Sequence, residues 1–164
     1  MNHDRQQERP LHILLVEDNE ADARFFHEVL KSVPLPTTVQ VVDDGQLALA
    51  FLRKQQEYAH APTPEVVFLD TLLPILSGAE VLVAMKQDEA LAQIPVWLFV
   101  LGVHDLSLTQ LASCEVQIEG WLTKPVEATQ LTAILRTVRS HTVGASTLQT
   151  RRSGERVVQD SSWS

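Results

Sequence analysis

The sequence predicts an α/β domain in which a parallel sheet is covered by helices on both faces. Apolar runs typical of buried strands alternate with segments whose apolar residues recur at helical spacing. Five strands and five helices alternate in this way, an order that favours right-handed crossovers between parallel strands. In addition, three of the strand-like runs end in charged residues. Because ligands bind at the carboxyl edge of an open parallel sheet, we expect the functional site at that edge.

The first predicted strand covers residues 11–16, and Asn19 can cap a helix that begins near Glu20. Asp22 is favourable in the first turn of this helix because of the helix dipole. One apolar stripe runs along the helix at positions i, i+3, i+4 and i+7, and two prolines that follow it end the helix. The stripe consists of Phe26, Val29, Leu30 and Val33.

The second strand is predicted at residues 39–42 and is followed by a turn at 43–45. The next helix is predicted to carry Leu47, Ala50 and Phe51 on one face. Residues 55–64 contain two prolines and little periodicity, which indicates a loop. The third strand is the apolar run 66–69, which leads directly into Asp70.

After Asp70, a loop bracketed by Pro74 and Gly78 leads into a helix that carries Leu82 and Met85. Pro95 precedes the fourth strand, predicted at residues 96–101. A weakly periodic helix is expected at residues 106–113.

The fifth strand is predicted at residues 118–122, and the Glu119-Gly120 pair within it indicates a position near an edge of the sheet. The last helix has an apolar stripe made of Leu131, Ile134, Leu135 and Val138. We therefore expect a polar N-terminal arm at residues 1–10, one domain at 11–140 and a polar tail at 141–164.

Composition excludes several classes of protein. The chain has 13 basic and 21 acidic residues and a net charge of −8, which argues against a nucleic-acid-binding face. Its one cysteine, Cys114, excludes an internal disulfide framework and fits a reducing compartment. The N-terminus lacks an apolar signal core, and the longest apolar run, residues 94–103, is about half the roughly 20 residues that a membrane helix needs. We expect a cytoplasmic protein without a membrane partner.

The charged strand ends form the candidate site. Glu17 and Asp18 follow the first strand, Asp70 ends the third, and Lys124 follows the fifth. Gathered carboxylates repel one another, and a hard cation such as Mg²⁺ binds their oxygens. Lys124 suits a phosphoryl oxygen as a point charge. Asp18 could instead cap a helix and Lys124 could form a plain ion pair, but together the four residues predict a phosphoryl acceptor in which Asp70 becomes an aspartyl phosphate.

Several short motifs, in this order and spacing, resemble the receiver domain of two-component response regulators. The resemblance extends from about Leu11 to Arg139. Its pieces are residues 13–19, Asp43-Asp44-Gly45 with Ala48-Leu49, Leu69-Asp70 through Leu73-Pro74 to Gly78, Ile94-Pro95-Val96 and Thr123-Lys124-Pro125.

The resemblance implies a flavodoxin-like fold with the strand order 2-1-3-4-5. It implies that Asp70 is the phosphoryl acceptor and that Lys124 assists it. It also implies that Mg²⁺ is bound by Asp18 and Asp70, by Glu17 through water, and by the backbone carbonyl of Leu72. The protein would then be a signalling module and not an enzyme.

Two segments, residues 17–22 and 81–96, are similar to regulators that serve phytochrome-type histidine kinases. This similarity implies a histidine kinase, of the phytochrome type, as the phosphoryl donor. It also implies a homodimer through the face made by the fourth helix, the fifth strand and the fifth helix. The family further suggests a cis peptide bond before Pro125, which orients Lys124.

The sequence departs from the family at its switch positions. The fourth receiver strand normally ends in Thr or Ser followed by a small residue, and here these places hold Val100 and Leu101. Val100 cannot donate a hydrogen bond to a phosphoryl group, and Leu101 can crowd the mouth of the site. The switching aromatic falls on Trp121, which is larger than the usual Tyr or Phe. We expect an intact phosphorylation site whose conformational response is weak or follows another route.

We therefore interpret the chain as a stand-alone response regulator, since the roughly 25 residues after Arg139 are too few for an output domain. The alternative is a pseudo-receiver that acts without phosphorylation as a binding module or phosphate sink, and the missing hydroxyl supports it. Two enzyme classes fit poorly. A dehalogenase-type phosphatase needs Asp-x-Asp where this chain has Glu17-Asp18-Asn19, and a flavin carrier needs a Ser/Thr/Gly phosphate loop where residues 19–22 are acidic.

Overall fold

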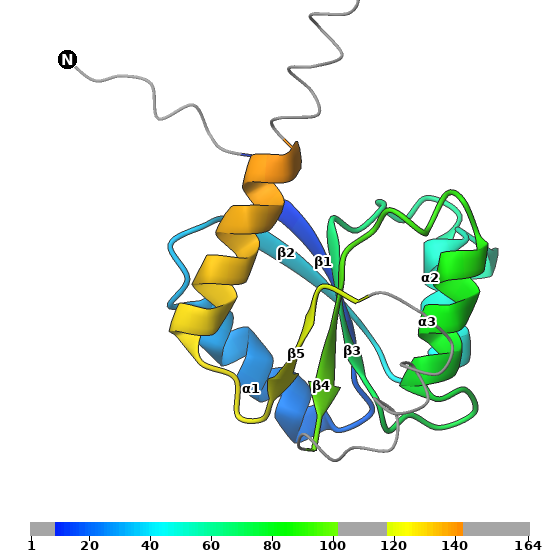
Figure 1. Cartoon of the computed structure of the whole chain (residues 1–164), viewed down its shortest axis with the longest axis horizontal. Helices are drawn as coiled ribbons and strands as arrows, with labels where there is room; N and C mark the ends of the chain where they lie inside the picture. Colours follow the sequence, from blue (N-terminus) through cyan, green and yellow to red (C-terminus); the bar gives the residue numbers. More distant parts are fainter. Residues whose placement is uncertain (1–8, 102–117, 143–164) are drawn as a thin grey trace, which may run out of the picture.

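A computed structural model describes residues 9–101 and 118–142 of the chain. Its centre is a sheet of five parallel strands in the order β2-β1-β3-β4-β5 (Figure 1). The strands are β1 (Leu11–Val16), β2 (Thr37–Val42), β3 (Val66–Asp70), β4 (Val96–Val100) and β5 (Gly120–Thr123). The predicted fold class and strand order are confirmed, and β3 lies in the middle of the sheet.

The helices form a layer on each face of the sheet. They are α1 (Glu20–Leu30), α2 (Gly45–Leu52), the short 3₁₀ helix η1 (Gln56–Tyr58), α3 (Gly78–Gln87) and a helix over residues 128–142. Figure 1 shows α1 and the helix over 128–142 on one face, and α2 and α3 on the other. Within residues 9–101 and 118–142, no helix is both long enough and apolar enough to cross a membrane.

Each face of the sheet has its own apolar core. Val67 and Leu69 of β3 pack with α2 and α3, whereas Val66 and Phe68 pack with α1 and the helix over 128–142. All four side chains are fully buried, because a central parallel strand is covered on both sides. In the second core, the Phe68 ring lies 5.1 Å from the Phe26 ring, measured between centroids. Successive residues of β3 therefore join opposite cores and hold Asp70 at a fixed place.

Local sequence sets where the helices begin near the carboxyl edge. The Asn19 side chain accepts hydrogen bonds from the backbone N–H groups of Ala21 and Asp22, at 2.9 and 3.1 Å, and so caps α1 as predicted. At the start of α3, Ser77 and Glu80 form a reciprocal capping box. These caps fix the first turns of α1 and α3, which lie beside the ends of β1 and β3.

Several predicted boundaries differ from the structure. Strand β2 begins at Thr37, two residues before its prediction, and β5 covers Gly120–Thr123 where residues 118–122 were expected. The edge position of β5 is confirmed. Gly120 is needed there because a Cβ atom would lie 2.5 Å from Cζ3 of the Trp97 ring. The loop predicted at 55–64 contains η1.

Two helices also differ in detail. Helix α1 ends at Leu30, before the prolines, although Val33 beyond its end is buried as the stripe predicted. Helix α2 buries Phe51 of its predicted face, whereas Leu47 and Ala50 are half-buried. Its fully buried side chains, which face the sheet and α3, are Ala48, Leu49, Phe51 and Leu52. The helix expected at residues 106–113, Cys114 and the residues of the tail from 143 onward lie outside the described residues.

Candidate functional site

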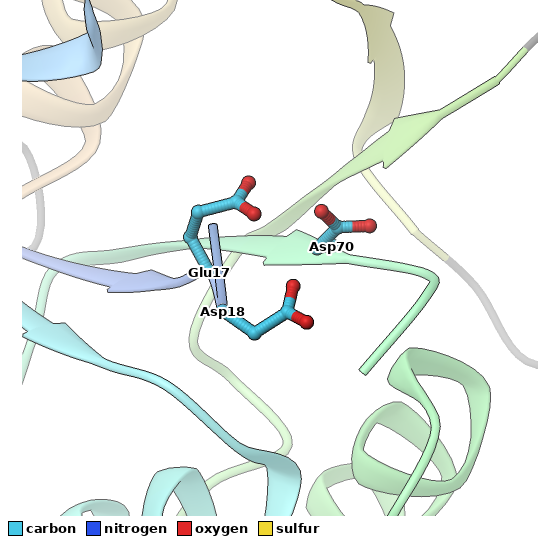
Figure 2. A group of neighbouring side chains, drawn as sticks. All are labelled: Glu17, Asp18 and Asp70. Atoms are coloured by element: carbon cyan, nitrogen blue, oxygen red, sulfur yellow. The ribbon is translucent and has the colours of Figure 1, made fainter. Parts of the chain in front are cut away.

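The candidate site lies at the carboxyl edge of the sheet, where the ends of β1, β3 and β5 bring charged residues together. Glu17 and Asp18 follow β1, Asp70 is the last residue of β3, and Lys124 follows β5. Figure 2 shows the three carboxylates turned toward a common space. One carboxylate oxygen from each lies within 4.8 Å of the other two. The structure thus brings together the residues that the sequence placed at this edge.

Burial of Glu17 and Asp70 disfavours the ionised form of their carboxylates. Glu17 is 3% exposed and Asp70 is 7% exposed, whereas Asp18 faces solvent. Burial is the main reason why the pKa of Glu17 rises to about 7, and the nearby charge of Asp70 adds to it. Hydrogen bonds from Lys124 and from the backbone N–H of Asn19 oppose this rise and do not cancel it. Glu17 therefore holds a proton more readily than an exposed glutamate.

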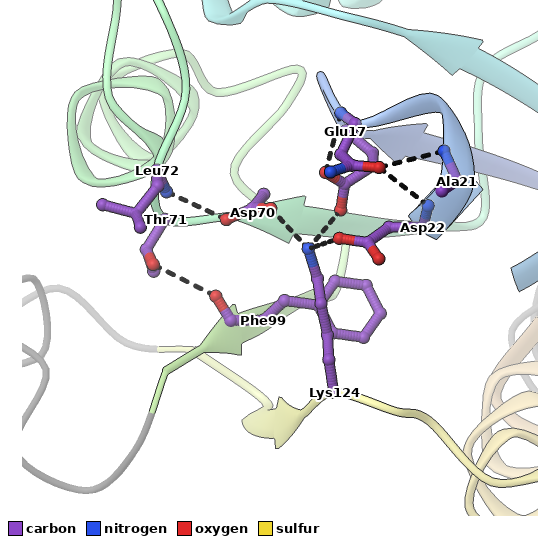
Figure 3. A network of polar contacts seen from close by, with 9 residues as sticks. Glu17, Ala21, Asp22, Asp70, Thr71, Leu72, Phe99 and Lys124 are labelled. Atoms are coloured by element: carbon purple, nitrogen blue, oxygen red, sulfur yellow. Dashed lines mark hydrogen bonds and ion pairs between the residues drawn. The ribbon is translucent and has the colours of Figure 1, made fainter. Parts of the chain in front are cut away.

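Lys124 is the cation that faces this cluster. Its Nζ donates hydrogen bonds to Glu17 Oε2 at 2.6 Å, Asp70 Oδ2 at 2.7 Å and Asp22 Oδ2 at 2.9 Å (Figure 3). Burial lowers the pKa of Lys124, but the bonds to Asp70, Glu17 and Asp22 more than offset that effect, so its pKa is raised. Lys124 is therefore a permanent cation at neutral pH. The peptide bond between Lys124 and Pro125 is cis.

The Asp70 carboxylate is held on two sides. Its Oδ1 accepts a hydrogen bond from the backbone N–H of Leu72 at 2.9 Å, and its Oδ2 accepts from Lys124. The loop that follows is packed closely, because a Cβ atom on Gly78 would lie 2.3 Å from the backbone oxygen of Asp70. The Thr71 hydroxyl donates to the backbone oxygen of Phe99 at 3.1 Å and joins the ends of β3 and β4. The orientation of Asp70 is therefore set by backbone groups and by Lys124.

The donor set fits a hard divalent cation. Three carboxylates pair with one ammonium group, and a fourth, that of Asp18, lies beside two of them, so the described side chains leave an excess of negative charge. All of the donor atoms in the acidic cluster are oxygens, the ligand type that Mg²⁺ and Mn²⁺ prefer. Leu72, whose carbonyl was predicted as a further ligand, lines the same cavity. The site can therefore bind a divalent cation and, beside Lys124, an anionic group.

The cavity over the site opens to solvent, and the apolar residues Val100 and Leu101 line part of it. It has a volume of about 390 Å³ and runs from Asp18 and Asp70 to Leu101. Val100 is buried beneath it, while 80% of Leu101 is exposed at its mouth. None of the described residues that line the cavity is Ser or Thr. Trp121, at the predicted switching position, is 51% exposed.

Asp22 is the site residue that sequence reasoning missed. The sequence indicated for it only a favourable place in the first turn of α1, yet its carboxylate contacts Lys124. A signal was present, because the first turn of the helix after β1 lies at the same edge as Glu17 and Asp18.

Comparison with known proteins agrees with this geometry. The family model described as response regulator receiver domain matches residues 13–136. Response regulator Rcp1 of Synechocystis sp. is 35% identical over 139 residues, which make up 85% of this chain and 93% of Rcp1.

Two solved structures are also similar. A crystal structure of the Mn²⁺-bound form of Rcp1 shares 36% identity with a TM-score of 0.65, and covers 80% of this chain and 93% of its own. A crystal structure of the phosphorylated cyanobacterial phytochrome response regulator RcpA shares 35% identity with a TM-score of 0.66, and covers 79% of this chain and 91% of its own.

Proposed function

The chain belongs to the response regulator receiver family, and from that premise we propose that it accepts a phosphoryl group on Asp70 from a histidine kinase in a two-component phosphorelay. The observation that carries the proposal is the setting of Asp70. It is a nearly buried carboxylate that stands between a lysine ammonium and two further acidic side chains. An isolated structural ion pair would not need the acidic neighbours, which destabilise one another.

In the proposed reaction, a carboxylate oxygen of Asp70 attacks the phosphorus atom of a phosphohistidine. A P–O bond forms, the P–N bond breaks, and its electron pair stays on the imidazole nitrogen, which takes a proton from solvent. Lys124, already within 2.7 Å of Asp70 Oδ2, is placed to neutralise the phosphoryl oxygens as negative charge shifts. The backbone N–H of Leu72 holds the second carboxylate oxygen in place.

Mg²⁺ is the proposed cofactor, held by the carboxylates of Asp18 and Asp70, with Glu17 through water and Leu72 through its carbonyl. Bound at this cluster, it supplies positive charge that balances the phosphoryl oxygens. The Mn²⁺-bound form of Rcp1 and the acidic cluster of this chain support the proposal.

A phytochrome-type histidine kinase is the proposed donor, because the chain is similar to a phytochrome response regulator over most of its length. We also propose that the receiver unit corresponds to residues 11–140. Self-association through the fourth helix, β5 and the helix over 128–142 remains a proposal from the family, since residues 102–117 lie outside the described part of the chain.

A second candidate function rests on Val100. Because its side chain has no hydroxyl, the end of β4 lacks the group that binds the phosphoryl oxygen in most receivers. A pseudo-receiver that binds its partner without phosphorylation, or that only stores phosphate, is consistent with this position.

Intact-mass spectrometry after incubation with acetyl phosphate separates the two. We expect one phosphoryl adduct that requires Mg²⁺ and is absent in Asp70→Asn. Glu80→Gln serves as the control. It removes one carboxylate charge from the capping box of α3, leaves Glu17, Asp18, Asp70 and Lys124 unchanged, and should keep the adduct. A folded wild-type protein that gains no adduct, with Mg²⁺ present, would favour the pseudo-receiver.

A further inference from the structure

Lys124 has three carboxylate partners, and they are not equivalent. Glu17 and Asp70 belong to the acidic cluster that can hold a divalent cation, whereas Asp22 lies outside it. Asp22 is also the most exposed of the three, with 42% of its side chain accessible, compared with 2% and 10% for Glu17 and Asp70. Figure 3 shows Asp22 approaching the ammonium group from α1.

A cation bound in the acidic cluster weakens the attraction of Glu17 and Asp70 for the Lys124 ammonium group. The carboxylates of Glu17 and Asp70, which accept from Lys124, are also two of the three that can hold the cation, and this second positive charge repels the ammonium group. Lys124 is carried on a flexible four-carbon stem and is one-third exposed, so it can turn toward water. Among the described residues that contact it, only Asp22 keeps a carboxylate that the cation does not share.

We propose that Asp22 is a positioning residue that anchors the Lys124 ammonium beside Asp70 when a divalent cation occupies the acidic cluster. The inference rests on the metal and phosphoryl site proposed above. In this arrangement Asp22 contacts neither the cation nor the phosphoryl group and acts through Lys124. A lysine that is already in place contributes more to phosphoryl transfer than one that must be ordered during the reaction.

The local structure of α1 prepares Asp22 for this role. The Asn19 side chain accepts from the backbone N–H of Asp22 at 3.1 Å, so the first turn of α1 is fixed where the carboxylate can reach Lys124. Glu20 lies in the same turn and is a matched control, because its exposed carboxylate pairs with Arg24 at 3.8 Å. Changing Glu20 or Asp22 to the amide removes one charge from this turn, and only the second change removes the charge of a carboxylate that pairs with Lys124.

The first test measures metal binding and does not depend on phosphorylation. Calorimetric titration with Mn²⁺ would compare wild type, Asp22→Asn, Lys124→Gln, the double variant and Glu20→Gln. Without Asp22, Lys124 competes more strongly for the oxygens of the cluster, so Asp22→Asn should raise the Mn²⁺ dissociation constant roughly two- to fivefold. In the Lys124→Gln background, Asp22→Asn should change the logarithm of the Mn²⁺ dissociation constant by less than half as much. An equal effect in both backgrounds would overturn the proposal, because Asp22 would then act on the cation directly.

The second test measures the initial rate of phosphorylation by acetyl phosphate at saturating Mg²⁺. Asp22→Asn should lower the rate roughly two- to fivefold, Asp22→Glu should restore most of it, and Glu20→Gln should leave it near the wild-type value. An unchanged or faster rate in Asp22→Asn contradicts the anchoring role. If the wild type itself gains no phosphoryl group, the proposed function fails, while the Mn²⁺ titrations still decide the role of Asp22.

Discussion

Glu17 should make the stability of the metal-free protein depend on pH. Its pKa rises from 4.5 in the unfolded chain to about 7 in the folded protein, so between these values the folded state holds a proton that the unfolded state has lost. The contribution to stability is complete below pH 4.5 and is lost as the pH rises through 7. A shift of this size corresponds to roughly 3 kcal/mol in total, and most of it falls between pH 5 and pH 8.

Urea unfolding in the presence of a chelator, at pH 5 and at pH 8, measures this loss. Glu17→Gln cannot titrate, so the difference in unfolding free energy between wild type and this variant isolates the glutamate from all other groups. We expect the wild type to lose roughly 2–3 kcal/mol relative to the variant over this range, a change of about 1–2 M in the urea midpoint. Mg²⁺ at 100 times its dissociation constant should return about 2.7 kcal/mol to the wild type at pH 8. Parallel pH dependences of the two proteins would refute the reasoning.

Three further predictions concern stability and switching. Val100→Thr should enlarge the change in Trp121 fluorescence on phosphorylation, because it supplies a hydroxyl at the end of β4. An unchanged signal would mean that the missing hydroxyl does not limit the conformational response. Gly120→Ala should destabilise the fold by about 1–3 kcal/mol in thermal or urea unfolding, since its Cβ would lie 2.5 Å from the Trp97 ring, and wild-type stability would show that the ring moves freely. Asn19→Ala should cost about 1 kcal/mol through loss of the α1 cap, and Asn19→Ser should recover most of it in the same assay.

The architecture and the acidic cluster could be predicted because both depend on local patterns. Each buried strand is a short apolar run, and the residue that ends the run is visible in the sequence, as with Asp70 after residues 66–69. Parallel topology then places the ends of β1, β3 and β5 at one edge. No knowledge of side-chain contacts was needed to bring Glu17 and Lys124 to the same site.

The features that escaped prediction depend on packing between elements. The contact of Asp22 with Lys124 requires the angle at which α1 leaves β1, which no local pattern encodes. The sequence did not indicate which side of α2 is most deeply buried, because most of this short helix is apolar and its periodicity is weak. In the register of β5, Gly120 pairs with Trp97 and leaves room for its ring, a fit between neighbouring strands that no local pattern encodes.

The three hydrogen bonds of Lys124 join it to residues that are 54, 102 and 107 positions away in the chain. Such contacts close only after the intervening strands have paired, since distant segments carry the largest cost of loop closure. During synthesis, β1 and β3 leave the ribosome well before Lys124, so the nascent chain carries the acidic residues without their ammonium partner. We therefore expect competence for phosphoryl transfer to arise late, when β5 joins the edge of the sheet. A chain that ends before Lys124 already carries Asp70 but lacks the ammonium group, so the proposed phosphoryl transfer should be slow until β5 has formed.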